Sequence, residues 1–271
     1  MSDKTRLDVA VFERGLSETR EKAKAMIMAG SVYVNDIKIT KSGTTVKADD
    51  AIEVRGKVNP YVSRGGLKLE KAVNSFNLNL SDTICMDIGA STGGFTDCML
   101  QNGASKVYSI DVGYGQLAWK LRCDERVVNL ERTNFRYITK DIIPELCDFA
   151  SVDVSFISLK KIIPVMRDFL INNGKSVCLI KPQFEAGREH LNKKGVVKDK
   201  KVHASVIDDI CSFALENGFD IIDADFSPVK GPEGNIEYLL YIEKSDAPVN
   251  KWNGSGDNLS ELSHNALDRE E

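Results

Sequence analysis

The stretch Met86-Asp87-Ile88-Gly89-Ala90-Ser91-Thr92-Gly93-Gly94-Phe95-Thr96 joins an apolar run to a series of small residues. The apolar run 83–88 predicts a buried strand, and a helix is expected to begin near Thr92. Small residues between a strand and a helix let the backbone approach a ligand closely, and the first helical turn offers unpaired N–H groups. The stretch therefore predicts a ligand site between a strand and a helix.

The rest of the chain from Arg64 onward repeats this alternation of short apolar runs and helical stretches. Such alternation predicts an α/β domain with a mostly parallel sheet and helices on both faces. The last two runs are joined through Pro228 and Gly231-Pro232-Glu233-Gly234, and are expected to form an antiparallel hairpin at one edge. Ligands in such sheets bind at the carboxyl ends of the strands. The further runs are 106–111, 126–130, 148–154, 176–180, 221–227 and 236–243.

Two acids indicate which cofactor the glycine-rich loop binds. Asp87 precedes the first glycine, whereas a loop that binds pyrophosphate would have few acids beside it, so a cationic ligand is favoured. Asp111 closes the next strand, where a carboxylate can accept hydrogen bonds from ribose hydroxyls. S-adenosylmethionine carries an ammonium and a sulfonium and fits this pattern; a dinucleotide is the competing ligand. The predicted cofactor-binding residues are Asp87, Gly89, Ala90, Ser91, Thr92, Gly93, Gly94, Phe95, Asp111, Glu131, Asn134 and Asp153.

Four charged residues interrupt or flank the predicted strands. A single lysine at a strand end usually reaches solvent, and a single aspartate there usually caps; two lysines and two acids together can make their joint burial tolerable. A lysine with a usual pKa of ~10.4 acts as a base when burial or another cation lowers its pKa, and neighbouring lysines would have that effect. These residues, called the tetrad below, are Lys68, Asp153, Lys181 and Glu237.

The tetrad favours methylation of a ribose hydroxyl over two other methyl transfers. Methylation of an exocyclic amine predicts an Asn/Asp-Pro-Pro-Tyr/Phe motif, whereas the corresponding place reads Asp153-Val154-Ser155-Phe156. Carbon methylation by a cysteine needs a cysteine-rich loop, whereas Cys178 lies inside a predicted strand. We therefore expect Lys181 to act as the general base, with Lys68, Asp153 and Glu237 orienting and tuning it.

The first sixty residues predict a separate small unit. Helices are expected over 7–12 and 18–29, with Ser17 as the N-cap of the second helix and Gly30 as its stop. Alternating residues on either side of Asn35-Asp36 predict a hairpin. The basic side chains of the second helix could contact phosphates without reading sequence. These side chains belong to Arg20, Lys22 and Lys24.

Two resemblances to known families follow from these motifs. Arg6-Leu7-Asp8 and Thr19-Arg20-x-x-Ala23-x-x-Met26-Ile27-x-x-Gly30-x-Val32-x-Val34-Asn35 resemble the S4-type RNA-binding domain. Residues 64–244 resemble FtsJ-like ribose 2′-O-methyltransferases, whose Lys-Asp-Lys-Glu residues match the tetrad. Both parts together resemble the TlyA-type family, which is described both as haemolysin A and as ribosomal RNA methyltransferase.

These resemblances imply a function and a partner. They imply S-adenosylmethionine-dependent methylation of cytidine 2′-hydroxyls in ribosomal RNA, with the RNA or a ribosomal subunit as the partner. A non-catalytic RNA-binding or ribosome-assembly factor is the alternative, and a pore-forming haemolysin is disfavoured. No metal and no obligate protein partner are expected. Expected RNA contacts are Arg6, Arg20, Lys22, Lys24, Arg64, Arg188, Lys193 and Lys194.

Composition sets the remaining expectations. The chain has 271 residues, of which 42% are hydrophobic and 28% charged, with a net charge of −4. The six cysteines form no C-x-x-C pair, which argues for reduced thiols rather than a disulfide framework or a zinc site. The absence of a signal region and of any run near ~18 apolar residues predicts a cytoplasmic protein. The predicted domains are 1–60 and 64–245, with a linker over 57–63 and a disordered acidic tail over 246–271.

Overall fold

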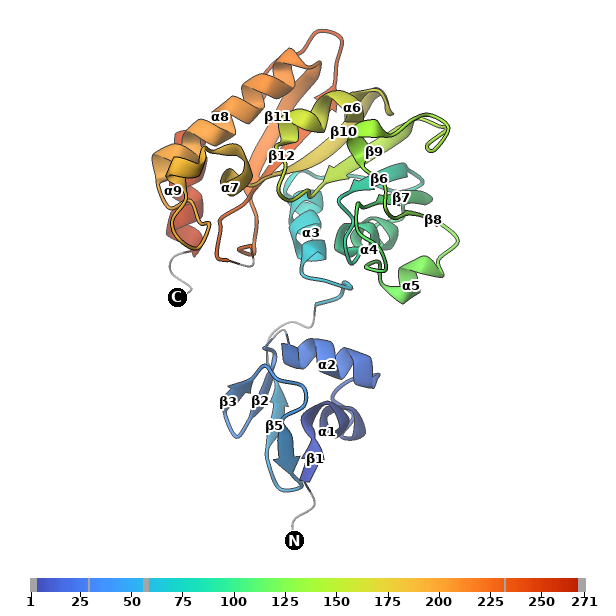
Figure 1. The fold of residues 1–271 in the computed structure, drawn as a ribbon, viewed down its shortest axis with the longest axis vertical. Coiled ribbons are helices and arrows are strands. Elements are labelled where there is room, and N and C mark those ends of the chain that lie inside the picture. Colours follow the sequence, from blue (N-terminus) through green and yellow to red (C-terminus); the bar gives the residue numbers. More distant parts are fainter. Residues whose placement is uncertain (1–3, 29, 56–58, 232, 268–271) are drawn as a thin grey trace. The chain divides into compact units, whose positions relative to one another are not determined.

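The computed structural model describes residues 4–28, 30–55, 59–231 and 233–267. The chain divides into two compact units, Met1–Pro60 and Tyr61–Glu271, called the N-terminal and C-terminal units below (Figure 1). Of the predicted linker, residues 57–58 lie outside the described residues, and 59–63 lead into helix α3 (Gly65–Ser75).

The N-terminal unit has the two helices and the following antiparallel strands that the sequence predicts, and a short strand, β1, that precedes the helices and was not predicted. Its core joins buried apolar residues of both helices to those of the strands, including Leu7, Ile27 and Val46. Strand order is β3-β2-β5 in one sheet, and β1 pairs with β4. The elements are β1 (Lys4–Arg6), α1 (Leu7–Glu13), α2 (Arg20–Met28), β2 (Val32–Val34), β3 (Ile37–Ile39), β4 (Thr45–Lys47) and β5 (Ile52–Val54).

Local geometry in this unit confirms one turn prediction and corrects one cap. Asn35 and Asp36 have φ values of 49° and 66°, the left-handed pair that closes a tight two-residue hairpin. Helix α2 begins at Arg20, and Oγ1 of Thr19 accepts a hydrogen bond from the Lys22 N–H at 3.1 Å. The cap is therefore Thr19 and not Ser17, because Thr19 directly precedes the helix, whereas the hydroxyl of Ser17 donates to the Thr19 carbonyl at 3.0 Å.

The C-terminal unit is built on a seven-stranded sheet with the order β11-β12-β10-β9-β6-β7-β8 (Figure 1). The five strands from β10 to β8 run parallel, and β12 is antiparallel to both β10 and β11. The mostly parallel sheet with an antiparallel pair at one edge is thus confirmed. The strands are β6 (Ile84–Ile88), β7 (Lys106–Ile110), β8 (Val127–Leu130), β9 (Cys147–Val152), β10 (Leu170–Ile180), β11 (Phe219–Phe226) and β12 (Tyr238–Lys244).

Because side chains alternate along the strands, each face of the sheet packs into its own hydrophobic core. In β6, Met86 and Ile88 pack on one face and Cys85 on the other. Helices α3 and α4 cover the Cys85 face, and α6, α8 and α9 contribute to the Met86 face. The helices that follow α3 are α4 (Gly94–Gln101), α5 (Trp119–Arg122), η1 (Phe135–Tyr137), η2 (Leu159–Lys161), α6 (Ile163–Arg167), α7 (Pro182–Glu185), η3 (Arg188–His190), α8 (Lys200–Glu216) and α9 (Gly256–Leu267).

The predicted disordered tail is wrong for residues 256–267, which form α9 and pack along α8 (Figure 1). Leu259, Ser263 and Leu267 recur every four residues and are buried, so a polar segment still presents one packed face. Gly256 starts the helix where a Cβ would lie 2.4 Å from the Ala204 carbonyl oxygen, and only glycine permits this approach. Residues 268–271 of the predicted tail lie outside the described residues.

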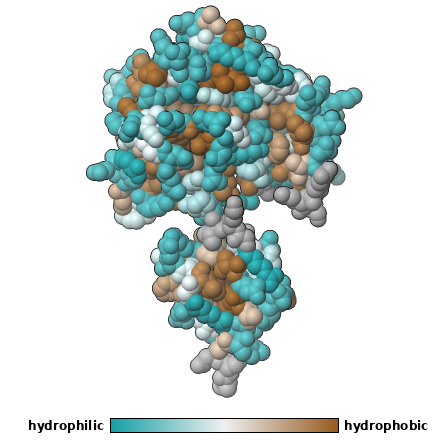
Figure 2. All heavy atoms as spheres, turned by 180° about the vertical axis from the view of Figure 1, so that it is seen from behind, coloured by the Kyte–Doolittle hydropathy of each residue, from teal (hydrophilic) through white to brown (hydrophobic). Residues whose placement is uncertain are grey.

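The surface of the C-terminal unit is mostly hydrophilic on the face that Figure 2 shows. Apolar side chains form small separate groups on this face. None of the helices in the described part of the chain combines the length and apolar character that a membrane crossing requires.

Candidate active site

The carboxyl ends of three parallel strands meet at a cavity of about 310 Å³ in the C-terminal unit. Strand β6 delivers Asp87 and the glycine-rich loop, β9 delivers Asp153, and β10 delivers Lys181. Glu237 precedes the antiparallel strand β12, which starts at this same edge of the sheet, and Lys68 reaches the cavity from α3. The topology thus brings together the four tetrad residues, which are far apart in the sequence.

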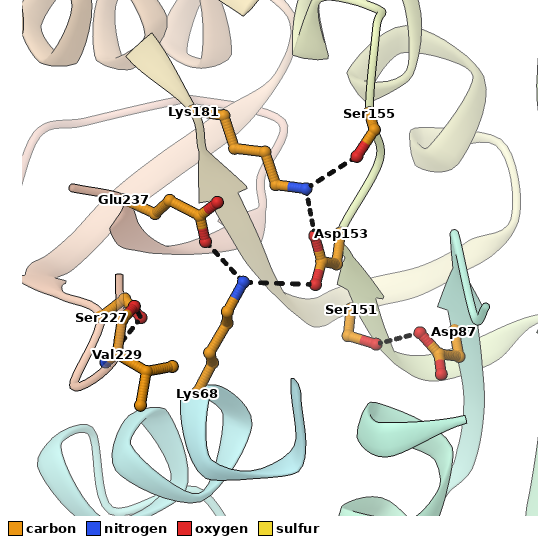
Figure 3. A network of polar contacts seen from close by, with 9 residues as sticks. All are labelled: Lys68, Asp87, Ser151, Asp153, Ser155, Lys181, Ser227, Val229 and Glu237. Atoms are coloured by element: carbon orange, nitrogen blue, oxygen red, sulfur yellow. Dashed lines mark hydrogen bonds and ion pairs between the residues drawn. The ribbon is translucent and has the colours of Figure 1, made fainter. Parts of the chain in front are cut away.

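The tetrad forms one continuous chain of ion pairs (Figure 3). Lys68 Nζ lies 2.5 Å from Glu237 Oε2 and 3.7 Å from Asp153 Oδ2. The other oxygen of Asp153 lies 2.5 Å from Lys181 Nζ, which also donates a hydrogen bond to Ser155 Oγ at 3.1 Å. One carboxylate therefore joins the two lysines.

Burial makes this pairing obligatory. Lys68 and Lys181 are 8% and 7% exposed, and Glu237 is 2% exposed. Burial works against the charge of Lys68, but Asp153 and Glu237 outweigh it and also outweigh Arg64, so the pKa of Lys68 is raised. The pKa of Lys68 is thus raised and not lowered, because two carboxylates lie close to its ammonium. Lys68 stays a cation.

The glycine-rich loop is shaped by two close approaches. Gly89 has a φ of 91°, and a Cβ there would lie 2.4 Å from the carbonyl oxygen of Asp153. A Cβ on Gly94 would lie 2.3 Å from Ser63 Oγ and 2.7 Å from the backbone nitrogen of Gly66. These glycines let the end of β9 and the start of α3 close around the loop, which sets the positions of Asp153 and Lys68.

Asp87 is fully buried at the start of the loop. Its Oδ2 accepts hydrogen bonds from the backbone N–H and the hydroxyl of Thr96, and its Oδ1 accepts one from Ser151. Burial outweighs these bonds and, together with the charge of Asp153, raises the pKa of Asp87 to about 7. A cation bound in the cavity would therefore favour the ionised form of this carboxyl.

Eight of the predicted cofactor residues line the cavity, and four do not. Those that line it are Asp87, Gly89, Ala90, Ser91, Thr92, Gly94, Phe95 and Asp153. Gly93 instead serves the backbone turn, with a φ of 92° and no space for a Cβ beside Leu121. Asp111 shapes the loop from outside, because it accepts hydrogen bonds from the N–H groups of Ser91 and Gly113 at 2.8 and 2.7 Å.

The two remaining cofactor predictions make structural contacts outside the cavity. Glu131 pairs with Arg122 and accepts a hydrogen bond from the Gly115 N–H at 2.9 Å. Asn134 caps the short helix η1 by accepting from the Arg136 N–H at 3.2 Å. Both positions were inferred from chain order alone, which does not reveal local capping and pairing.

The predicted RNA contacts in the N-terminal unit are exposed cations, and two of them share a buried anchor. Nε of Arg6 and Nε of Arg20 lie 2.9 and 3.0 Å from the two oxygens of Asp8. Asp8 is 2% exposed, and the hydrogen bond from Arg6, supported by Arg20, lowers its pKa to about 2 in spite of burial. Lys22 pairs with Glu18 on the surface, and Lys24 is exposed. No local sequence pattern marks Asp8 as the residue that holds both arginines.

The other predicted RNA contacts lie in the C-terminal unit. Arg64 lines the cavity beside Lys68. Arg188, Lys193 and Lys194 are exposed on the segment that follows the Lys181 end of β10. Six further residues of the lining have no site role that the sequence indicates, because they become neighbours of the tetrad only through the fold; they are Ser63, Gly65, Ser155, Val229, Lys230 and Gly231.

Comparison with known proteins places both units in established families. The FtsJ-like methyltransferase family model matches residues 61–244, and the S4 domain model matches residues 5–52. The 16S/23S rRNA (cytidine-2′-O)-methyltransferase TlyA of Mycobacterium tuberculosis is 39% identical over 243 residues, which cover 89% of this chain and 91% of that protein. Hemolysin A of Brachyspira hyodysenteriae is 45% identical over 88% of this chain and 99% of its own length.

A solved structure, described as a putative hemolysin from Streptococcus thermophilus, is similar over the whole chain. It superposes with a TM-score of 0.80 at 46% sequence identity, covering 100% of this chain and 99% of that chain. The match thus extends over both units and includes the sequence that forms α9.

Proposed function

Since the chain belongs to the FtsJ-like methyltransferase family, we propose that it transfers a methyl group from S-adenosylmethionine to a ribose 2′-hydroxyl in ribosomal RNA. The observation that carries the proposal is the pairing of Lys68 and Lys181 through Asp153 beside the glycine-rich loop. The names of the relatives supply the finer assignment to cytidine.

The residues of the cavity fit this cofactor. Small side chains leave room for it at residues 89–92, and the nearby acids Asp87 and Asp153 favour positive charge. When bound, S-adenosylmethionine supplies an electrophilic methyl group on a cationic sulfur. The loop and Asp87 would hold its cationic end, and Asp153 faces both the cofactor site and the tetrad lysines.

Lys181 is the residue that we assign as the general base. In the proposed step, the uncharged Nζ of Lys181 would accept the proton of the 2′-hydroxyl. The ribose oxygen would take the methyl group that bound S-adenosylmethionine would supply, with the electron pair of the former carbon–sulfur bond left on the sulfur. Lys68 keeps its proton, because Asp153 and Glu237 raise its pKa. It therefore balances the charge of Asp153 when Lys181 is neutral, and Ser155 fixes the direction of the Lys181 amine.

The test is transfer of radioactive methyl from S-adenosylmethionine to purified ribosomal subunits and to their naked RNA. We expect alkali-resistant dinucleotides containing the label, which identify a 2′-O-methyl group. Lys181→Ala should lower the transfer rate by at least ~100-fold, the usual worth of a general base, with cofactor binding retained. The matched control is Lys175→Ala, an exposed lysine of the same strand.

Three outcomes would contradict the proposal. Label found only in modified bases would exclude ribose as the acceptor. Full activity of Lys181→Ala would exclude Lys181 as the base, whereas RNA binding without any transfer by the wild-type protein would favour a non-catalytic ribosome-assembly factor.

A further inference from the structure

A second cavity of about 310 Å³ adjoins the catalytic cavity, and Lys230 lines both. Two lysines and one histidine line it, and the described residues of its lining include no aspartate or glutamate. The described lining of the cavity is therefore positively charged. Its described lining residues are Val196, Val197, Lys198, Lys230, Gly234, Ile236 and His264.

The walls of this second cavity are fixed by buried side chains. Asn235, 4% exposed, accepts a hydrogen bond from the Val197 N–H at 3.2 Å and donates one to the Gly195 carbonyl at 3.1 Å. His203 contacts the Val197 carbonyl through Nε2 at 2.9 Å and the Tyr238 hydroxyl through Nδ1 at 2.6 Å. Because a carbonyl only accepts, Nε2 carries the hydrogen, and Nδ1 accepts from Tyr238. The segment that bears Lys198 is thus attached to the β12 side of the catalytic site.

The C-terminal helix α9 supplies the remaining polar group. His264 is 8% exposed, and its ring centroid lies 5.0 Å from that of His203. The neighbouring Ser263 lies 3.0 Å from the Tyr238 hydroxyl, which holds this turn of α9 against the sheet. The helix therefore places a nearly buried histidine in the wall of a cavity that is otherwise formed by the segments around Lys198 and Lys230.

We propose that the second cavity binds a backbone phosphate of the RNA beside the nucleotide that is methylated, an inference that rests on the proposed function. A phosphate suits two ammonium groups, and a ring N–H of His264 can donate to it in either protonation state. Contacts of this kind position the RNA and carry no sequence information. Because Lys230 borders both cavities, a phosphate held here fixes the neighbouring ribose close to Lys181.

The experiment measures binding and turnover with the ribosomal subunit that the wild-type protein methylates. Lys198→Gln and His264→Gln alter the second cavity alone, and Lys175→Gln is the matched control on an exposed lysine of β10. We expect Lys198→Gln to raise the KM for RNA about tenfold, the usual effect of losing one charged hydrogen bond. The slope of log Kd against log KCl concentration should fall by about 0.7 to 0.9, which corresponds to one lost phosphate contact. The KM for S-adenosylmethionine should stay unchanged.

Two results separate the inference from the function on which it rests. If Lys198→Gln and His264→Gln keep the RNA affinity and salt slope of Lys175→Gln while the wild type methylates the subunit, the phosphate site is refuted and the methyltransferase stands. If the wild type methylates neither subunits nor naked RNA, the proposed function fails and the inference fails with it.

Discussion

Replacing Glu237 by glutamine tests whether the tetrad is a true buried charge network. Glu237→Gln removes the carboxylate that lies 2.5 Å from Lys68 and keeps the shape of the side chain. Among the described residues, Lys68 then retains one carboxylate partner, Asp153 at 3.7 Å, in a site where Lys68 is 8% exposed. The protein must therefore bury an ammonium that is poorly compensated.

The expected loss of unfolding free energy in Glu237→Gln follows from the burial of Lys68. Removing one partner of a buried pair costs about 3 to 5 kcal/mol, and the surviving contact with Asp153 favours the lower value of about 3 kcal/mol. For a domain the size of the C-terminal unit, this corresponds to a decrease in Tm of about 6 to 12 °C. The control is Asp225→Asn, whose partner Lys71 lies 2.9 Å away with both side chains 23% exposed; we expect a loss of about 1 kcal/mol or less.

The assay is urea unfolding followed by tryptophan fluorescence. Trp119 and Trp252 both belong to the C-terminal unit, so the signal reports that unit alone. The pKa of Lys68 is raised above its usual 10.5, so its stabilising contribution is fully present below pH 10.5 and is lost as the pH rises through the folded-state pKa. The difference in unfolding free energy between the wild type and Glu237→Gln should therefore be largest near pH 7 and decrease above pH 10.5.

Two results would refute this reasoning. Equal losses in Glu237→Gln and Asp225→Asn would mean that burial adds nothing to the pair. If the difference in unfolding free energy between the wild type and Glu237→Gln stays constant up to pH 11, the charge of Lys68 does not contribute to that difference.

Two further predictions concern the cofactor site and the C-terminal helix. Because burial raises the pKa of Asp87 to about 7, S-adenosylmethionine should bind more tightly as the pH rises from 5.5 to 7.5, and calorimetry on Asp87→Asn should show weaker binding without this trend. A wild-type affinity that is constant over this range would exclude an ionising Asp87 from binding. Leu259→Ala on the buried face of α9 should lower the unfolding free energy by about 2 to 4 kcal/mol, whereas Leu262→Ala, which is 60% exposed, should change it by less than about 0.5 kcal/mol in urea titrations. Equal small effects would mean that α9 is not packed in solution.

The sequence by itself predicted the alternation of strands and helices in the C-terminal unit and the four residues of the tetrad. Apolar runs of five to eight residues mark strands whether or not the rest of the fold is known, because a strand buried on both faces needs apolar side chains throughout. The position of the glycine-rich loop could also be predicted from the sequence, since Gly89 and Gly94 stand where a close backbone approach requires glycine. The polar composition of residues 246–271 led to the wrong prediction of disorder for α9, because the buried face of this helix depends on the spacing of its apolar residues and not on the overall composition.

Only the tertiary structure decided which charges touch and which cavity they face. Lys68 and Glu237 are 169 residues apart, and no local pattern specifies that they pair or that Asp153 is shared between two lysines. The same holds for Asp111, Glu131 and Asn134, whose partners are set by loops that fold back on the strand ends. Local residue types restrict backbone conformation, whereas the distance between side chains that are remote in sequence depends on how the sheet orders its strands and how the helices pack on it.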